Sequence, residues 1–228
     1  MPTSPSPPAR IALETSSRPP SIAVQVGARN AFRRLDEDRR NASDLLPVLA
    51  ELLEELGSAP AHIERIVVGT GPGSYTGLRV GIATALGLAR ATGAELVGVP
   101  SVEALARAGL QIDEEGVVLL DARSHQLYYA HYRRTRTGIE AVVAPTITTP
   151  TELVELLPDQ IPILADPGVA EAAELNASQR ARLRSGFAPE AEALLELGLA
   201  RLEQDGPMQL TEIRPLYLRP FAVHPRRR

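Results

Sequence analysis

The glycine-rich stretch GTGPGSYTGLRVG at residues 69–81 carries the clearest chemical signal in the sequence. It lies between an expected strand at 63–68 and an expected helix at 78–92, where backbone amides and the helix dipole can hold an anion. On this interpretation the anion or nucleotide loop consists of Gly71, Gly73, Ser74 and Thr76. The glycine spacing differs from a Rossmann fingerprint, and there is no Walker lysine. The alternative is a tight turn that needs positive φ and close strand–helix packing.

Three charged residues could add catalytic groups to such a loop. Glu14 ends the first expected strand, where nucleotide-handling folds often place a catalytic acid, and Asp121 and Arg123 follow a buried strand at 117–120. Together with Mg²⁺ they would serve an ATP-binding phosphotransferase or a hydrolase. The alternative for Asp121 and Arg123 is a local ion pair in a turn, and one acid without a partner of known geometry is weak evidence for catalysis.

The same glycines also follow a helical period. Small residues recur every four positions, and in a helix they would form one ridge that lets another helix approach closely. The ridge consists of Gly73, Gly77, Gly81 and Ala85. Its partner would be either the leucine-rich helix expected at 45–56 of this chain or a helix of another subunit.

Composition removes several other chemistries. The chain has 228 residues and a formal net charge of −4, its 24 basic residues are all arginine, and it has no cysteine. A phosphate-loop lysine, a Schiff-base lysine, a cysteine nucleophile and a thiolate metal site are therefore excluded. The four histidines lack metal-ligand spacing, so we expect no metal site. The few aromatic residues and the slight acidity argue against a nucleic-acid-binding surface.

The order of elements predicts a duplicated α/β fold. Three strands, a helix, a strand and a helix occur twice, and three antiparallel strands followed by alternating elements indicate a mixed sheet with flanking helices. In the first half these elements are expected at 10–14, 21–26, 28–35, 45–56, 63–68, 78–92, 95–99 and 102–108. In the second half they are expected at 117–120, 126–132, 139–147, 151–157, 161–165, 170–183 and 189–203. Asn41 or Ser43 would cap the helix at 45–56.

These elements suggest two lobes between short terminal segments. We expect a disordered leader at 1–9, an N-terminal lobe at 10–110, a C-terminal lobe at 111–220 and a tail at 221–228, with the helix at 189–203 folding back onto the first lobe. No window is apolar enough for a signal peptide or a membrane span, so the cytoplasm is the expected location.

Four segments together resemble the TsaB family, also called YeaZ: the glycine-rich stretch at 69–81, LLP at 45–47, LLDAR at 119–123 and PLYLRP at 215–220. The resemblance covers about residues 10–220. It implies two RNase H-like lobes of the actin/sugar-kinase/Hsp70 (ASKHA) superfold. It also implies a role in making threonylcarbamoyladenosine beside the tRNA anticodon, in which TsaC supplies threonylcarbamoyl-adenylate and TsaD transfers the threonylcarbamoyl group.

In that family TsaB is the non-catalytic partner of TsaD. The H-x-x-x-H metal pair of catalytic relatives is replaced here by Asn-Ala-Ser-Asp-Leu at 41–45, and the usual Asp-Thr of the first strand is Glu14-Thr15. The resemblance therefore implies a pseudoenzyme scaffold, whereas the alternative is an ASKHA phosphotransferase or a glycoprotease-like hydrolase.

The resemblance also implies partners and a docking surface. It implies a heterodimer with TsaD, the ATPase TsaE in the larger complex, a homodimer when alone, and tRNA contact only through the complex. No resident cofactor is implied, and ATP or ADP would bind at the partner interface. The docking helices near 45–56 and 76–91 would use Leu45, Leu46, Leu49, Leu52, Leu53, Gly73, Gly77, Arg79, Gly81 and Ala85.

Overall fold

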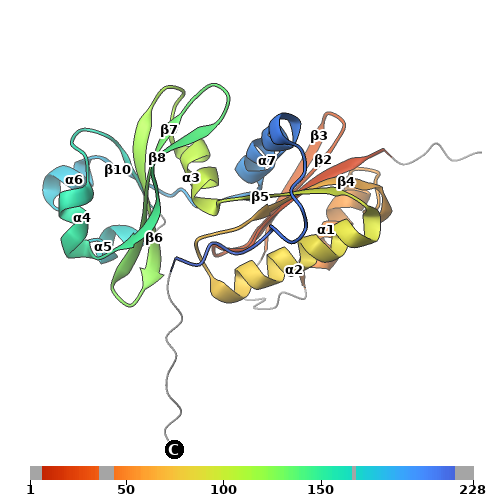
Figure 1. The fold of residues 1–228 in the computed structure, drawn as a ribbon, viewed down its shortest axis with the longest axis horizontal. Helices are drawn as coiled ribbons and strands as arrows, with labels where there is room; N and C mark the ends of the chain where they lie inside the picture. Colours follow the sequence, from red (N-terminus) through yellow and green to blue (C-terminus); the bar gives the residue numbers. More distant parts are fainter. Residues whose placement is uncertain (1–6, 36–43, 166–167, 219–228) are drawn as a thin grey trace, which may run out of the picture.

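Two five-stranded sheets, one in each half of the sequence, form the frame of the protein (Figure 1). The computed structural model describes residues 7–35, 44–165 and 168–218. The first sheet contains β1 (Ala9–Glu14), β2 (Ser21–Val26), β3 (Arg29–Arg34), β4 (Ile63–Gly69) and β5 (Glu95–Val99). The second contains β6 (Glu115–Arg123), β7 (Gln126–Arg134), β8 (Ile139–Thr148), β9 (Ile163–Ala165) and β10 (Leu183–Ser185).

Both sheets follow the same strand plan. The orders are β3-β2-β1-β4-β5 and β10-β9-β6-β7-β8, so the second sheet repeats the first with β6 in the place of β1. In each sheet the first three strands are antiparallel, and the first, fourth and fifth are parallel. This is the RNase H-like plan, and the predicted fold of two such lobes of the ASKHA superfold is confirmed.

Helices α1 (Leu45–Glu55) and α2 (Tyr75–Thr92) cover one face of the first sheet. The leucines of α1 at positions 45, 49, 52 and 53 are buried against this face, and each contributes about 1.5–3 kcal/mol by leaving water. Ser74 caps α2 by accepting a hydrogen bond from the Gly77 amide, and Gly93 ends the helix in the left-handed region with a φ of 74°. The caps predicted at Asn41 or Ser43 for α1 lie outside the described residues.

The middle of the molecule is built from two helices that are exchanged between the lobes. Helix α3 (Ser101–Gly109), which follows the first sheet in sequence, packs on the second sheet through Val102 and Leu105. Helix α7 (Ala191–Asp205), which follows the second sheet, packs on the free face of the first sheet through Leu194. Figure 1 shows the two helices lying between the sheets. Each lobe is therefore completed by the other half of the chain, and the predicted packing of the late helix on the first lobe is found.

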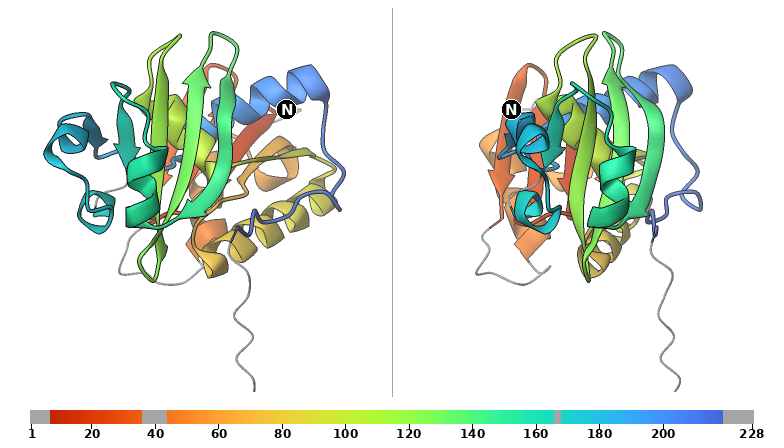
Figure 2. Two further views of the ribbon diagram at one scale, coloured as in Figure 1. Left: turned by 60° about the vertical axis from the view of Figure 1, so that its left-hand side comes forward. Right: turned by 90° about the vertical axis from the view of Figure 1, so that its left-hand side faces the viewer.

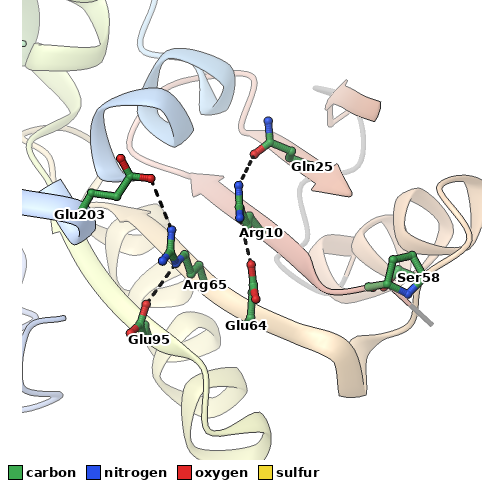
Figure 3. Close-up of polar contacts among 8 residues, drawn as sticks. Arg10, Gln25, Ser58, Glu64, Arg65, Glu95 and Glu203 are labelled. Atoms are coloured by element: carbon green, nitrogen blue, oxygen red, sulfur yellow. Dashed lines mark hydrogen bonds and ion pairs between the residues drawn. The ribbon is translucent and has the colours of Figure 1, made fainter. Parts of the chain in front are cut away.

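Ion pairs hold α7 in this position. Arg65 on β4 pairs with Glu95 on β5 at 3.1 Å and with Glu203 near the end of α7 at 3.7 Å (Figure 3). Arg201 of α7 pairs with the largely buried Glu103 of α3, and burial raises the pKa of this carboxyl while the nearby guanidinium opposes the rise. The contacts between α3 and α7 link the two lobes.

The outer side of the second lobe differs from the prediction. Helix α4 (Pro150–Leu156) forms as expected, but the helix predicted at 170–183 is wrong. Two short helices occur instead, α5 (Val169–Ala172) and α6 (Ala177–Ala181), followed by β10. The helix is interrupted because Asn176 caps the start of a new helix, α6, through a capping box with Gln179. None of the described helices is long and apolar enough to cross a membrane.

The ends of the described chain are tied to the first lobe. β1 begins at the fully buried Ala9, so the leader predicted at 1–9 is too long. After α7, residues 207–218 form a C-terminal strap that crosses the free edge of β5 and reaches α2 (Figures 1 and 2). Along the strap the Met208 amide donates to Leu96 O at 3.0 Å, and the Leu216 amide donates to Thr70 O at 2.7 Å.

Candidate functional site

The glycine loop between β4 and α2 directs its amides into the protein. Four amides of the loop have acceptors within the chain: those of Thr70, Gly71, Ser74 and Gly77 donate to Val99 O, Ser101 Oγ, Ser16 O and Ser74 Oγ at 2.9, 3.1, 2.8 and 3.3 Å. An anion would need such amides free. Gly71 has a φ of 93°, which a residue with a side chain adopts only with strain. The contacts therefore favour the tight-turn interpretation over a phosphate loop.

The small residues of α2 face inward, onto the turn after β1. A Cβ added at Gly77 or Gly81 would fall on the Thr15 backbone oxygen or hydroxyl, and one at Gly73 would overlap Ser16. Ala85 is also fully buried. Neither predicted partner for this ridge, the helix at 45–56 or another subunit, matches the contacts of its glycines. These positions require glycine because the turn after β1, and not a second helix, lies directly against them.

Most of the predicted docking leucines are also inside the protein. Leu45, Leu49, Leu52 and Leu53 are at most 2% exposed, whereas Leu46 is 51% exposed. The predicted interface residues that reach the surface are therefore Leu46 on α1 and Arg79 on α2. The leucine pattern predicted the helix correctly. The leucines that repeat with the helical period face the sheet, because a surface helix buries its apolar stripe.

The surfaces of α1 and α2 that point away from the sheet form what we call the α1–α2 outer face. Its exposed small or uncharged residues are Leu46, Pro47 and Ala50 on α1, and Thr76, Ala83 and Gly87 on α2; the two helices also expose Glu51, Glu54, Glu55, Arg79 and Arg90. A Cβ at Gly87 would meet nothing within 4 Å, so this part of α2 is open. Sequence reasoning missed Pro47, Ala50, Ala83 and Gly87. One signal in the sequence could have identified this face. Arg79 lies two residues before the buried Gly81 and therefore on the opposite side of the helix, and a charged arginine is expected on the side that faces solvent.

Two tyrosines and an arginine form a stacked cluster at the start of this face. The ring centroids of Tyr75 and Tyr217 are 5.3 Å apart with an interplanar angle of 32°, and the Arg79 guanidinium lies 5.2 Å from the Tyr75 ring centre. Arg79 also donates a hydrogen bond to the Tyr75 hydroxyl at 2.7 Å. The two rings are 44% and 40% exposed. Tyr217 comes from the C-terminal strap, so the cluster joins distant parts of the sequence.

Glu14 is a buried carboxyl and not an open catalytic group. Its side chain is fully buried, the Ser16 amide donates to Oε1 at 2.6 Å, and the other oxygen packs against the Cα of Gly69 beside Ser101. Burial raises the pKa of Glu14, and hydrogen bonds from Ser16 and Ser101 partly oppose this rise. A longer acid fits here because Gly69 has no side chain.

Asp121 and Arg123 form a local pair at the surface of the second lobe. The Arg123 amide donates to Asp121 Oδ1 at 2.7 Å, and the guanidinium lies 3.3 Å from Oδ2. Arg123, Ser124 and His125 all have positive φ, which makes the tight turn between β6 and β7. The local ion-pair alternative for these two residues is therefore the one observed. Over the described ranges the structure shows no cluster of three acidic or histidine side chains that could hold a metal ion.

Comparisons with known proteins agree on one family. Residues 37–192 match the family model described as TsaD, tRNA N6-adenosine threonylcarbamoyltransferase. The chain is 28% identical to the tRNA threonylcarbamoyladenosine biosynthesis protein TsaB of Escherichia coli over 92% of its own length and 94% of that protein. It is 34% identical to an uncharacterized protein of Mycobacterium tuberculosis, over 72% of this chain and 74% of that one.

A solved structure supports the same assignment. YeaZ from Pseudomonas aeruginosa superposes with a TM-score of 0.80 at 25% sequence identity, covering 92% of this chain and all of that one. The similarity therefore extends over both lobes.

Proposed function

We propose that this chain, which belongs to the TsaB (YeaZ) family within the broader TsaD family, acts in tRNA threonylcarbamoyladenosine biosynthesis as a scaffold that binds TsaD and stabilises its active form. Family membership supports the role in this biosynthesis. The docking and the absence of catalysis by the chain itself are our proposal. The single observation that carries it is the α1–α2 outer face.

This face has the composition of a docking surface. Small or apolar residues are exposed along both helices, and Leu46, one of the larger exposed apolar side chains of the protein, lies on it at 51% exposure. The small residues Ala83 and Gly87 would allow the backbone of a partner helix to approach α2 closely. Both helices are held rigidly by the core beneath them, so little conformational entropy would be lost on binding.

The buried polar groups support binding over catalysis. Glu14 is enclosed beneath the loop between β4 and α2, and two amides of the predicted anion loop, those of Gly71 and Ser74, donate to the chain's own acceptors. A phosphotransferase using Glu14 would need to open this packed junction. The observed contacts favour a closed, packed junction between β1, β4 and α2 over an open ligand site.

The proposal extends to the other members of the assembly. We expect TsaE to join the larger complex, tRNA to bind through the complex, and a second copy of the chain to cover the same face when TsaD is absent. ATP or ADP would bind at the partner interface and not within this chain alone. The cytoplasm is the expected location, because tRNA is modified there.

The test is the affinity of the full chain for TsaD from the same organism, measured by calorimetry and by light scattering coupled to size exclusion. We expect a heteromeric complex for the wild type and at least about 100-fold weaker binding for Ala83→Arg, because a long charged side chain would separate the helices. Ala172→Arg, at an exposed position of α5 in the second lobe, is the matched control and should bind normally.

Two results would contradict the proposal. One is the absence of a complex between the wild-type chain and TsaD under any nucleotide condition. The other is equal binding by Ala83→Arg and Ala172→Arg, which would move the docking site away from the α1–α2 outer face.

A further inference from the structure

We propose that the cluster of Tyr75, Arg79 and Tyr217 is the anchor of the α1–α2 outer face. In this proposal Arg79 binds a carboxylate of the protein partner, and the two tyrosine rings bind an apolar side chain beside that carboxylate. The inference rests on the proposed docking function, and it names the residues and the partner chemistry that dominate the binding.

The charge of Arg79 supports a carboxylate as its ligand. Within the part of the chain that the structure describes, the Arg79 guanidinium pairs with no acidic side chain; it contacts the ring and hydroxyl of Tyr75. Arg34 provides an internal comparison, because it also lies over an aromatic ring, Phe32, but pairs with Glu190. Arg79 is thus oriented by its tyrosine and keeps donors for a second, charged group, and the planar guanidinium suits a carboxylate.

The cluster is organised before a partner arrives. Arg79 is fixed by its hydrogen bond to Tyr75, and Tyr75 is stacked on Tyr217. Side chains that are already ordered lose little entropy on binding. Tyrosine and arginine are also among the residues that most often dominate protein–protein affinity. Both facts make this cluster a stronger anchor than the flat surface of Ala83 and Gly87.

The C-terminal strap delivers Tyr217 to this position. Ile213 is buried at 4% exposure in the core beneath α2, and the Leu216 amide bonds to Thr70 O at 2.7 Å. These two fixed points precede Tyr217 directly and set its ring beside Tyr75. The strap therefore adds a second, distant segment to the docking surface, and this surface is continuous along α2 from Tyr75 to Gly87.

A protein partner fits the cluster better than RNA. Arg79 lies over the Tyr75 ring and Tyr217 packs against it, so contacts within the cluster already engage the ring on which a nucleobase would stack. On α1, Glu51 and Glu55 pair with Arg33 of β3 at 3.1 and 2.6 Å, and Glu54 is also exposed. This helix therefore adds no excess positive charge to the surface, whereas a phosphate backbone is bound by several cationic side chains.

The test is the affinity for TsaD of full-length Arg79→Glu and Tyr217→Ala, measured by calorimetry beside the wild type. We expect each variant to bind about 30-fold more weakly or worse. Tyr217→Phe keeps the ring and removes the hydroxyl, which hydrogen-bonds to the Tyr75 side chain within the cluster. It should stay within about 3-fold of the wild type, because in this proposal the ring packs against the partner. Arg136→Glu, at an exposed arginine in the turn between β7 and β8 of the second lobe, is the charge-matched control and should also stay within about 3-fold.

Unfolding midpoints separate loss of the anchor from loss of the fold. Tyr217→Ala removes a side chain of the strap, whereas Arg79→Glu keeps every strap residue and removes the cation that is proposed to bind the partner. If both bind TsaD as the wild type does while Ala83→Arg does not, docking stands and the anchor is overturned. If the wild type itself does not bind, the proposed function falls and the anchor with it. If Arg79→Glu weakens salt-dependent tRNA binding by the chain alone but not TsaD binding, the cluster is an RNA contact and the inference is overturned.

Discussion

The two lobes share one strand plan but use the turn after their first strand in opposite ways. In the first lobe, Glu14, Thr15 and Ser16 follow the end of β1 and are all buried, at 0%, 4% and 6% exposure. In the second lobe, Asp121 and Arg123 occupy the corresponding end of β6, and both are exposed and paired with each other. Equivalent positions of the fold are therefore buried in the first lobe and exposed to solvent in the second.

The helix that follows the fourth strand of each sheet explains the difference. In the first lobe this helix is α2, with 18 residues, and its glycines allow it to close over the β1–β2 turn. In the second lobe the corresponding helix is α5, with only four residues. Because α2 buries its small residues inward, its opposite surface is the one that we propose for docking. The closed turn of the first lobe and the proposed docking surface thus lie on opposite sides of the same helix.

The largest expected effect is at Gly77, where the closure of α2 over the turn can be broken. Gly77→Ala should lower the free energy of unfolding by about 3 kcal/mol, because the new methyl group meets the Thr15 backbone, which cannot move freely. Gly87→Ala, on the open side of the same helix, should raise it by about 0.5–1 kcal/mol through helix propensity. Urea unfolding measures both, and equal effects of the two substitutions would contradict the inward orientation of the ridge.

An intermediate effect is expected from the buried acid. Burial raises the pKa of folded Glu14 above the ordinary value of a glutamate side chain. The folded protein then keeps a proton that the unfolded chain loses, so the stability from protonated Glu14 is complete below about pH 4.5 and declines as the pH rises through the folded pKa. This decline is about 1.4 kcal/mol for each unit by which the pKa is raised.

Glu14→Gln removes the titrating group while keeping an acceptor for the Ser16 amide. It should therefore be more stable than the wild type at pH 7, and the difference should shrink toward pH 4.5. Denaturant unfolding at a series of pH values measures this, with the exposed Asp121→Asn as the control that tests the equivalent turn. A variant that is less stable than the wild type by the same amount at every pH would show that Glu14 is not held as a buried acid.

The smallest expected effect is at the open turn of the second lobe. Asp121→Ala should change the free energy of unfolding by no more than about 0.5–1 kcal/mol, because it removes an exposed ion pair and one local hydrogen bond. Its affinity for TsaD should equal that of the wild type. A loss of several kcal/mol would mean that this turn is packed as tightly as the first, and the contrast between the lobes would disappear.

Local patterns were enough to predict most of the fold. Alternating and continuous apolar runs located the strands of both sheets, and the leucine period located α1, because such patterns reflect burial directly. The prediction of one helix at 170–183 was wrong because the apolar pattern continues through the loop that separates α5 from α6. The capping pair Asn176 and Gln179 is a local signal for that break, while β10 is stabilised by pairing with β9, which is a tertiary contact.

The proposed docking surface was harder to predict than the helices that carry it. Small residues at a four-residue period allow close approach by anything, and the sequence cannot say whether a turn of the same chain or a partner helix approaches. The leucine stripe of α1 has the same ambiguity, because the sequence does not tell whether it packs on the sheet of this chain or on a partner. The stacking of Tyr75 on Tyr217 depends on the path of the C-terminal strap across β5, and no local pattern encodes that path.

The most direct test of the central claim is hydrogen exchange of the full chain, alone and in complex with TsaD, measured by mass spectrometry. The account predicts slower exchange on binding in α1, in the first turns of α2 and in the strap near Tyr217, with the β6–β7 turn unchanged. Protection confined to the second lobe, with α1 and α2 exchanging as in the free chain, would contradict it.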